Sequence, residues 1–160
     1  MSHKILIKVG VLVEDKGKLL LIKEKRWLDG TYRWNIIKGS FDPKQDRDFL
    51  ATARREAKEE ANASIKLKNL LNVIYLQKDN QTLIQFNYTA NLLGSHFSIS
   101  DTRQQKKYRS DEDIIEARLF SKKELKTMKK GVLVGKRTYI SIQAWLKGKS
   151  SPLETIRIIH

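Results

Sequence analysis

Residues 49–61 carry the pattern that most restricts what this chain can fold into, an amphipathic helix. Leu50, Ala53 and Ala57 recur at helical spacing and form an apolar stripe. Asp48 precedes the first turn, where an aspartate side chain accepts hydrogen bonds from free backbone amides. The pattern therefore predicts a capped helix with one face on a core.

The polar face of this helix carries three carboxylates. Glu56, Glu59 and Glu60 stand at i, i+3 and i+4, so their side chains share one face. Like charges at this spacing repel by a few tenths of a kcal/mol per pair. A hard divalent cation such as Mg²⁺, which prefers oxygen ligands, would relieve that repulsion. The alternative is a solvated helix face, with the repulsion softened by neighbours such as Arg55 and Lys58.

The segment before the helix makes the acidic face more informative. Residues 34–37 read as a short strand that leads to Gly39, and a polar loop over residues 43–48 joins it to the helix. This order resembles the Nudix hydrolases, whose signature is Gly-x5-Glu-x7-Arg-Glu-U-x-Glu-Glu-x-Gly-U, with U a bulky aliphatic residue. Gly39 matches the first glycine, and residues 55–60 match the Arg-Glu-U-x-Glu-Glu core.

The first half of the signature departs from the family. The spacing from Gly39 to Arg55 is two residues longer than the pattern, so the first glutamate falls on Gln45 when counted forward and on Arg47 when counted back. Neither residue is acidic, so the first glutamate of the signature has no match at either count. The last glycine is replaced by Asn62, which also favours a left-handed helix cap.

The resemblance implies a metal site and an arginine that orients it. It assigns Glu56, Glu59, Glu60 and Gly39 to the binding of Mg²⁺ or Mn²⁺. It also assigns Glu59 and Arg55 to catalysis, with Arg55 positioning the carboxylates through an ion pair to Glu59 at i, i+4. An ordinary surface ion pair is the alternative for Arg55.

A second acidic segment precedes the predicted strand at residues 114–120. Many Nudix enzymes take a further carboxylate from a later segment as catalytic base or extra ligand. Glu112, Asp113 and Glu116 occupy the matching place, and the sequence does not choose among them. A solvated entrance to the strand is the alternative.

Aromatic and basic residues cluster just ahead of the signature. Trp27, Tyr32, Arg33 and Lys38 combine rings that stack on a nucleobase with cations that bind phosphates. We therefore expect these four residues to bind the substrate.

The remaining pattern fits one domain over residues 1–160. We expect further helices after Ser121, which begins a capping box, and over residues 135–146. Residues 94–110 lack periodic apolar positions and are expected to form a surface loop, and the apolar end, residues 153–159, packs on the body or on a partner. Further strands are predicted over residues 5–13, 19–22, 65–76, 82–93 and 114–120. The order of elements and the resemblance both indicate an α+β fold, an α/β/α sandwich with a mixed sheet between helices.

Composition narrows the class of protein. The chain has no cysteine and no apolar run long enough to cross a membrane, so a cytoplasmic protein is expected. Its net charge is +14, and residues 121–160 hold ten basic and two acidic residues. Such a surface attracts nucleotides, polyphosphates or RNA. The alternative is a charge that serves solubility or reflects an organism with basic proteins throughout.

Three functions remain open from the sequence. The favoured one is a metal-dependent hydrolase that cleaves a diphosphate linkage in a nucleoside-diphosphate-X substrate. The second is a Nudix-fold domain with weak or no catalysis that binds nucleotide or RNA through its basic surface. The third is an unrelated basic RNA-binding protein whose charged helix has no catalytic role. A monomer and a homodimer are both compatible with the sequence.

Overall fold

A mixed β-sheet forms the centre of the molecule. The computed structural model describes residues 2–26, 28–99 and 113–159. Within them the sheet order is β3-β2-β1-β6-β5-β8, with β4 joined to β1 and β7 joined to β2. The β1 and β6 strands run parallel, and the other ladders are antiparallel. The strands are β1 (Lys4–Asp15), β2 (Lys18–Lys25), β3 (Tyr32–Asn35), β4 (Ile37–Ser40), β5 (Ile65–Lys78), β6 (Gln81–Leu92), β7 (Ile114–Phe120) and β8 (Ser151–Pro152).

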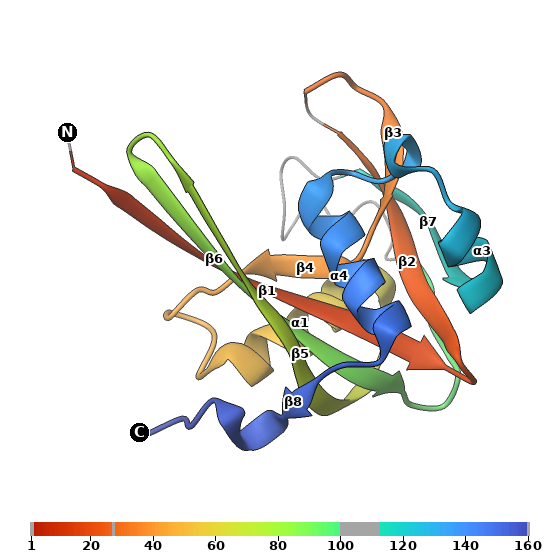
Figure 1. The fold of residues 1–160 in the computed structure, drawn as a ribbon. Helices are drawn as coiled ribbons and strands as arrows, with labels where there is room; N and C mark the ends of the chain where they lie inside the picture. Colours follow the sequence, from red (N-terminus) through yellow and green to blue (C-terminus); the bar gives the residue numbers. More distant parts are fainter. Residues whose placement is uncertain (1, 27, 100–112, 160) are drawn as a thin grey trace.

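Helices cover both faces of this sheet (Figure 1). Alanines of α1 pack on the side of β1 that carries Val9 and Val11, whereas Ile142 and Trp145 of α4 pack on the opposite side with Leu12. The predicted α/β/α sandwich is therefore confirmed. The helical elements are α1 (Phe49–Ala61), α3 (Lys122–Thr127), α4 (Lys136–Lys147) and the 3₁₀ turns η1 (Lys130–Val132) and η2 (Leu153–Thr155).

The α1 helix begins and ends as predicted. The Asp48 side chain accepts from the backbone amide of Ala51 at 2.8 Å. At the other end Asn62 adopts a left-handed conformation with φ 47°, and its amide donates to carbonyls of the last turn. These two caps fix where α1 begins and ends.

The strand predicted over residues 34–37 is in fact two strands separated at Ile36. The β3 strand pairs with β2, whereas β4 pairs with β1 along Lys8–Val11. The β2 strand meets β1 only at the tip of their hairpin, so β4 fills the place beside β1 that β2 leaves. The local pattern could not predict this division, because it depends on two different long-range partners.

The C-terminal segment packs on the body of the protein. Leu153 and Ile156 contact the core cluster on the α1 side of the sheet, whereas Ile159 is 92% exposed. This result decides between the two expectations for residues 153–156. In the described part of the chain, no helix combines the length and apolarity required to cross a bilayer.

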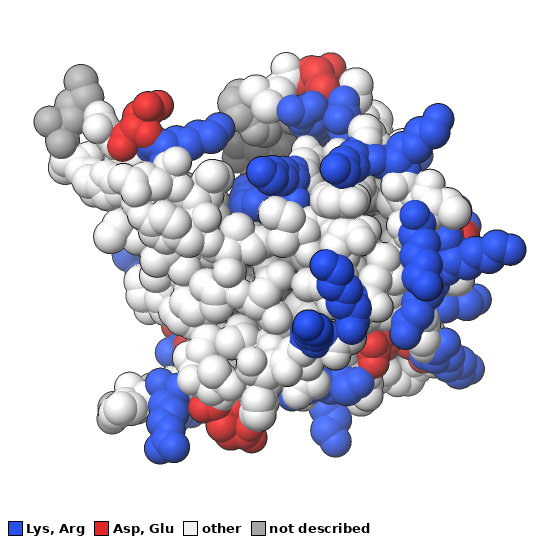
Figure 2. Space-filling model, in the orientation of Figure 1, with Lys and Arg blue, Asp and Glu red and all other residues white. Residues whose placement is uncertain are grey.

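Positive charge is concentrated on one part of the surface. Residues 118–149 contain ten lysines and arginines and a single acidic residue, Glu124. Glu124 pairs with Arg118 and completes the capping box of α3, so its carboxylate already has partners. Figure 2 shows basic side chains gathered over α3 and around α4.

Candidate active site

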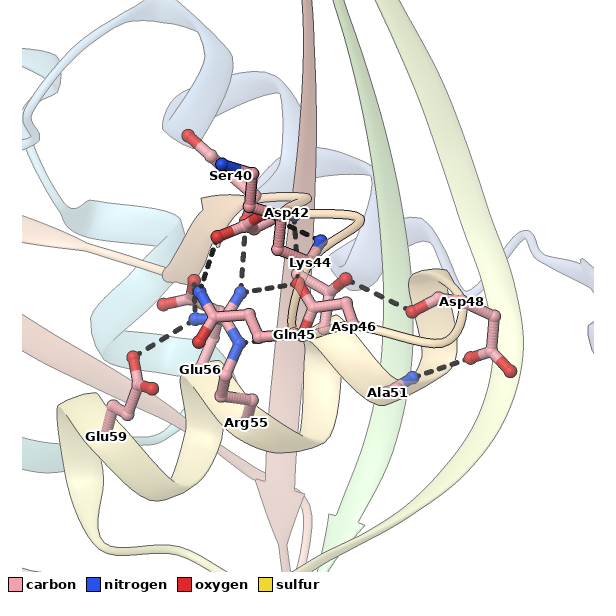
Figure 3. Close-up of polar contacts among 11 residues, drawn as sticks. Ser40, Asp42, Lys44, Gln45, Asp46, Asp48, Ala51, Arg55, Glu56 and Glu59 are labelled. Atoms are coloured by element: carbon pink, nitrogen blue, oxygen red, sulfur yellow. Dashed lines mark hydrogen bonds and ion pairs between the residues drawn. The ribbon is translucent and has the colours of Figure 1, made fainter. Parts of the chain in front are cut away.

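The carboxylates of the signature region are organised around Arg55 (Figure 3). The Arg55 guanidinium donates from Nε to Asp46 Oδ1 and from Nη2 to Asp46 Oδ2, both at 2.7 Å. Two parallel bonds between planar groups fix orientation as well as distance. Burial alone would raise the pKa of Asp46, but the bonds from Arg55 and from the Asp42 amide hold that pKa below its usual value. The same contact with Asp46 raises the pKa of Arg55.

Arg55 also contacts two of the three helix glutamates. Its Nη1 lies 2.8 Å from Glu56 Oε1 and 3.2 Å from Glu59 Oε2, and Nη2 donates to the Ser40 carbonyl at 3.1 Å. The i, i+4 pair between Arg55 and Glu59 is therefore present. Through these bonds one side chain joins the loop before α1, the end of β4 and the acidic face of α1.

The third glutamate faces β4 directly. Glu60 Oε2 accepts from the Lys38 backbone amide at 3.1 Å. Gly39, the next residue, is buried and pairs with Val9 of β1. The glycine turn and the acidic end of α1 thus lie side by side, as the sequence order suggested.

Burial distinguishes the three glutamates. Glu56 and Glu60 are only 1% and 2% exposed, whereas Glu59 is more accessible. Among the described residues, no group of three or more His, Cys, Asp or Glu side chains has the geometry of a formed metal site. Arg55 contacts both Glu56 and Glu59 and compensates part of their negative charge.

A second buried polar network adjoins this cluster through Lys38. Lys38 Nζ lies 3.7 Å from Glu24 Oε1, and the same oxygen accepts from Asn35 Nδ2 at 2.8 Å. The Asn35 side-chain oxygen in turn accepts from Thr138 Oγ1 at 2.5 Å. Glu24, Asn35 and Thr138 are all buried. A continuous set of polar contacts therefore runs from the acidic end of α1 to the first turn of α4.

Comparison with known proteins decides the family. A model of the NUDIX domain matches residues 4–140. The chain belongs to the Nudix family. Nudix hydrolases act on pyrophosphate-containing substrates and generally use divalent metals such as Mg²⁺. None of the curated proteins matches the sequence significantly.

Solved Nudix structures share the fold of this chain. A NUDIX hydrolase from Nitrosomonas europaea is 19% identical with a TM-score of 0.77, and the match covers 98% of each chain. A MutT NUDIX hydrolase from Burkholderia pseudomallei is 18% identical with a TM-score of 0.65, covering 88% of this chain and 98% of that one. An ADP-ribose pyrophosphatase from Streptococcus suis is 17% identical with a TM-score of 0.62, covering 89% and 90%.

Asp46 was missed by sequence reasoning, and the structure shows why. The Nudix signature places its first acid on Gln45 or Arg47, depending on the direction of counting, and Asp46 lies between them. The chain is one residue longer than the pattern on each side of Asp46. Asp46 is 4% exposed and is the acidic residue of this loop that Arg55 contacts. Counting from Gly39 and from Arg55 gives the positions on either side of Asp46, and this was the sequence signal that could have identified it.

The acidic residues predicted from the later segment lie on a different strand pair. Asp113 Oδ2 accepts from the Tyr32 hydroxyl at 3.0 Å, and Glu116 lies 3.7 Å from Lys23 Nζ. The hydrogen bond to Asp113 raises the pKa of the Tyr32 hydroxyl. The contacts of these two carboxylates are thus to Tyr32 of β3 and Lys23 of β2.

The three described members of the predicted substrate-binding set have different neighbours. Arg33 turns toward the β2–β3 connection, where its Nη2 lies 3.2 Å from Asp29 Oδ2. Lys38 is the member of this set that contacts the glutamate cluster, through its amide. Trp27 and Glu112, the remaining predicted residues, lie outside the described residues.

Proposed function

We propose that this Nudix chain is a metal-dependent hydrolase that cleaves a diphosphate linkage in a nucleoside-diphosphate-X substrate. The observation that carries the proposal is the gathering of Glu56, Glu59 and Glu60 where α1 meets β4, with Arg55 among them. On a solvated helix face all three carboxylates would be exposed, whereas here two of the three are buried.

The donor set suits a hard divalent cation. Glu56, Glu59 and Glu60 offer only oxygen ligands, which Mg²⁺ and Mn²⁺ prefer, and Gly39 adjoins them on β4. The metal would neutralise phosphate charge and acidify the attacking water. Arg55 then serves as a positioning residue, because its bonds hold the carboxylates of Glu56 and Glu59.

A proton acceptor and substrate contacts complete the proposal. Asp113 and Glu116 on or beside β7, together with Glu112, are the candidates for the catalytic base. Of Asp113 and Glu116, we favour Asp113 as the base. Its carboxylate accepts a hydrogen bond from Tyr32, a proposed substrate-binding residue. We propose Trp27, Tyr32, Arg33 and Lys38 as substrate-binding residues.

The substrate class is tested by a panel of compounds. One similar structure is an ADP-ribose pyrophosphatase, so ADP-ribose belongs beside nucleoside triphosphates, dinucleoside polyphosphates and 5′-triphosphorylated RNA. Release of phosphate, pyrophosphate or nucleoside monophosphate is measured with Mg²⁺, with Mn²⁺ and with chelator. We expect turnover of at least one compound that chelator abolishes. Absence of turnover with both metals would contradict the proposal.

The basic surface over α3 and α4 favours a second candidate, binding of RNA with weak or no catalysis. Phosphate contacts release counterions, so the affinity should fall steeply as salt rises. Fluorescence anisotropy with a labelled single-stranded RNA at 50 and 200 mM salt tests this candidate. Salt-sensitive binding without turnover on the panel would favour it over the hydrolase. For either function we propose a cytoplasmic protein, monomeric or homodimeric.

A further inference from the structure

Arg137 is a half-buried cation that contacts a neutral side chain of the sheet. It lies in the first turn of α4, and its Nη1 donates to Gln85 Oε1 on β6 at 2.6 Å. No carboxylate of the described chain forms an ion pair with Arg137. Burial lowers the pKa of this guanidinium, as expected for a partly desolvated cation.

A chain of buried amides holds the residue that Arg137 contacts. Gln85 Nε2 donates to Asn87 Oδ1 at 2.8 Å, and Asn87 Nδ2 donates to Asn72 Oδ1 at 2.8 Å and to Ser141 Oγ at 3.1 Å. Gln85 and Asn87 are completely buried. Because the nitrogen of Gln85 is already used, its oxygen must face Arg137. These hydrogen bonds hold Gln85 in place, and its oxygen in turn fixes the position of the Arg137 guanidinium.

Gly10 places this support next to the proposed active site. A Cβ at Gly10 would lie 2.2 Å from Asn87 Oδ1, so a side chain on β1 would disrupt the amides. Gly10 pairs with Asn87 on one side and with Lys38 on the other. Two strand spacings, roughly 10 Å, therefore separate the amides under Arg137 from Lys38, whose amide contacts Glu60.

The bond to Gln85 uses only part of the donor capacity of Arg137. A guanidinium has five N–H donors, and Gln85 accepts from one of its nitrogens. In the described part of the chain, the buried side-chain N and O atoms without a partner are Tyr88 OH and Thr89 Oγ1, and no atom of Arg137 is among them. A fixed cation with accessible donors in a planar fork is suited to bind an oxyanion.

We propose that Arg137 binds an oxyanion of the substrate, a phosphate or carboxylate group, at a point roughly two strand spacings from β4. The inference rests on the proposed function only in taking the ligand to be the substrate. Because α1 and α4 lie on opposite faces of the sheet, a ligand that reaches both would pass the edge of β4, where Glu60 contacts the Lys38 amide. The substrate class is thereby narrowed to compounds with a second anionic group beyond the phosphate attacked at the glutamates.

Phosphate binding without turnover tests the site. Inorganic phosphate, and acetate in a separate arm, are titrated into ¹⁵N-labelled protein with chelator present, and amide shifts of Arg137, Gln85 and their neighbours are followed. In Arg137→Gln the Kd of the bound anion should rise by about tenfold or more, the worth of a charge-assisted hydrogen bond. Lys136→Gln removes the same charge from the adjacent exposed position and should change the Kd by less than about twofold. Saturable amide shifts with phosphate would identify the ligand group as a phosphate, and saturable shifts with acetate would identify it as a carboxylate.

The outcomes separate this site from the proposed function. Because chelator is present, anion binding at Arg137 is measurable whether or not the protein is a hydrolase. Where turnover is found, Arg137→Gln should raise KM by about tenfold and leave kcat within about threefold. If neither anion shifts the Arg137 region, or if Arg137→Gln lowers the melting temperature while anion binding and KM stay unchanged, Arg137 only ties α4 to the sheet and the proposal is wrong.

Discussion

Asp46 and Arg55 form a two-point ion pair, with both carboxylate oxygens 2.7 Å from guanidinium nitrogens. The pair joins the loop before α1 to the middle of the helix, nine residues later. Through the same guanidinium, Asp46 is connected to Glu56 and Glu59. Through Arg55, this loop acid therefore helps to orient two of the three proposed metal ligands.

Removing the charge of Asp46 should destabilise the protein and impair the site. Asp46→Asn leaves a largely buried guanidinium without its main partner, and we expect a loss of about 3 kcal/mol in the free energy of unfolding. Turnover should fall by about tenfold or more, because Arg55 no longer fixes the glutamates. Urea denaturation and kcat/KM measure the two effects. Asp79→Asn, in the exposed β5–β6 turn, should change stability by less than about 0.5 kcal/mol. Equal effects of the two substitutions would contradict this role.

The stabilisation by Asp46 should depend on pH. Its pKa in the folded state lies below the ordinary aspartate value of 3.8, so the ion pair contributes fully above pH 3.8 and is lost as pH falls through the folded-state pKa. The stability difference between the wild type and Asp46→Asn should therefore be constant from pH 7 to about 5 and shrink below pH 3.8. Urea denaturation of both proteins across this range measures it. A difference that grows on acidification would show that Asp46 is not the stabilising charge.

The N-cap of α1 should have a measurable effect of its own. Asp48→Ala removes the acceptor of the Ala51 amide and should cost about 1 kcal/mol in the free energy of unfolding. Asp48→Ser keeps a capping oxygen and serves as the control, with most of the stability retained. If alanine and serine were equivalent, the cap would contribute nothing to this helix.

The buried network beside Lys38 should tolerate little change. Thr138→Val keeps the shape of the side chain but leaves the Asn35 oxygen without its donor, which should cost about 1–3 kcal/mol. Thr155→Val makes the same change at an exposed position and should be nearly neutral. Thermal unfolding of the two variants is the measurement. A neutral Thr138→Val would mean that water replaces the hydroxyl.

Local sequence patterns predicted the elements better than their partners. The α1 helix was predicted with its cap, because Asp48 and the apolar stripe are local signals. The capping box of α3 was predicted for the same reason. The division of residues 32–40 into β3 and β4 was not, because it depends on β2 and β1 competing for one segment.

In the candidate site, too, the residues with a local sequence signal were predicted and those brought in from distant segments were not. The spacing of Glu56, Glu59 and Glu60 is written in the sequence, whereas Asp46 required knowledge of how a lengthened loop folds back on the helix. Glu24 and Asn35 lie at the ends of strands and meet Thr138 from a distant helix. The one local signal for them was a polar residue near the end of an apolar strand.

The most direct test of the account compares turnover of the wild type, Glu59→Gln and Glu154→Gln on the same panel of diphosphate compounds with Mg²⁺. Glu154 is exposed in η2, so its variant controls for the loss of one carboxylate. If the glutamates around Arg55 form the catalytic site, Glu59→Gln should lower kcat/KM by about 100-fold, while Glu154→Gln should stay within about twofold of the wild type. Full activity of Glu59→Gln would contradict the claim that the glutamates around Arg55 are the catalytic site.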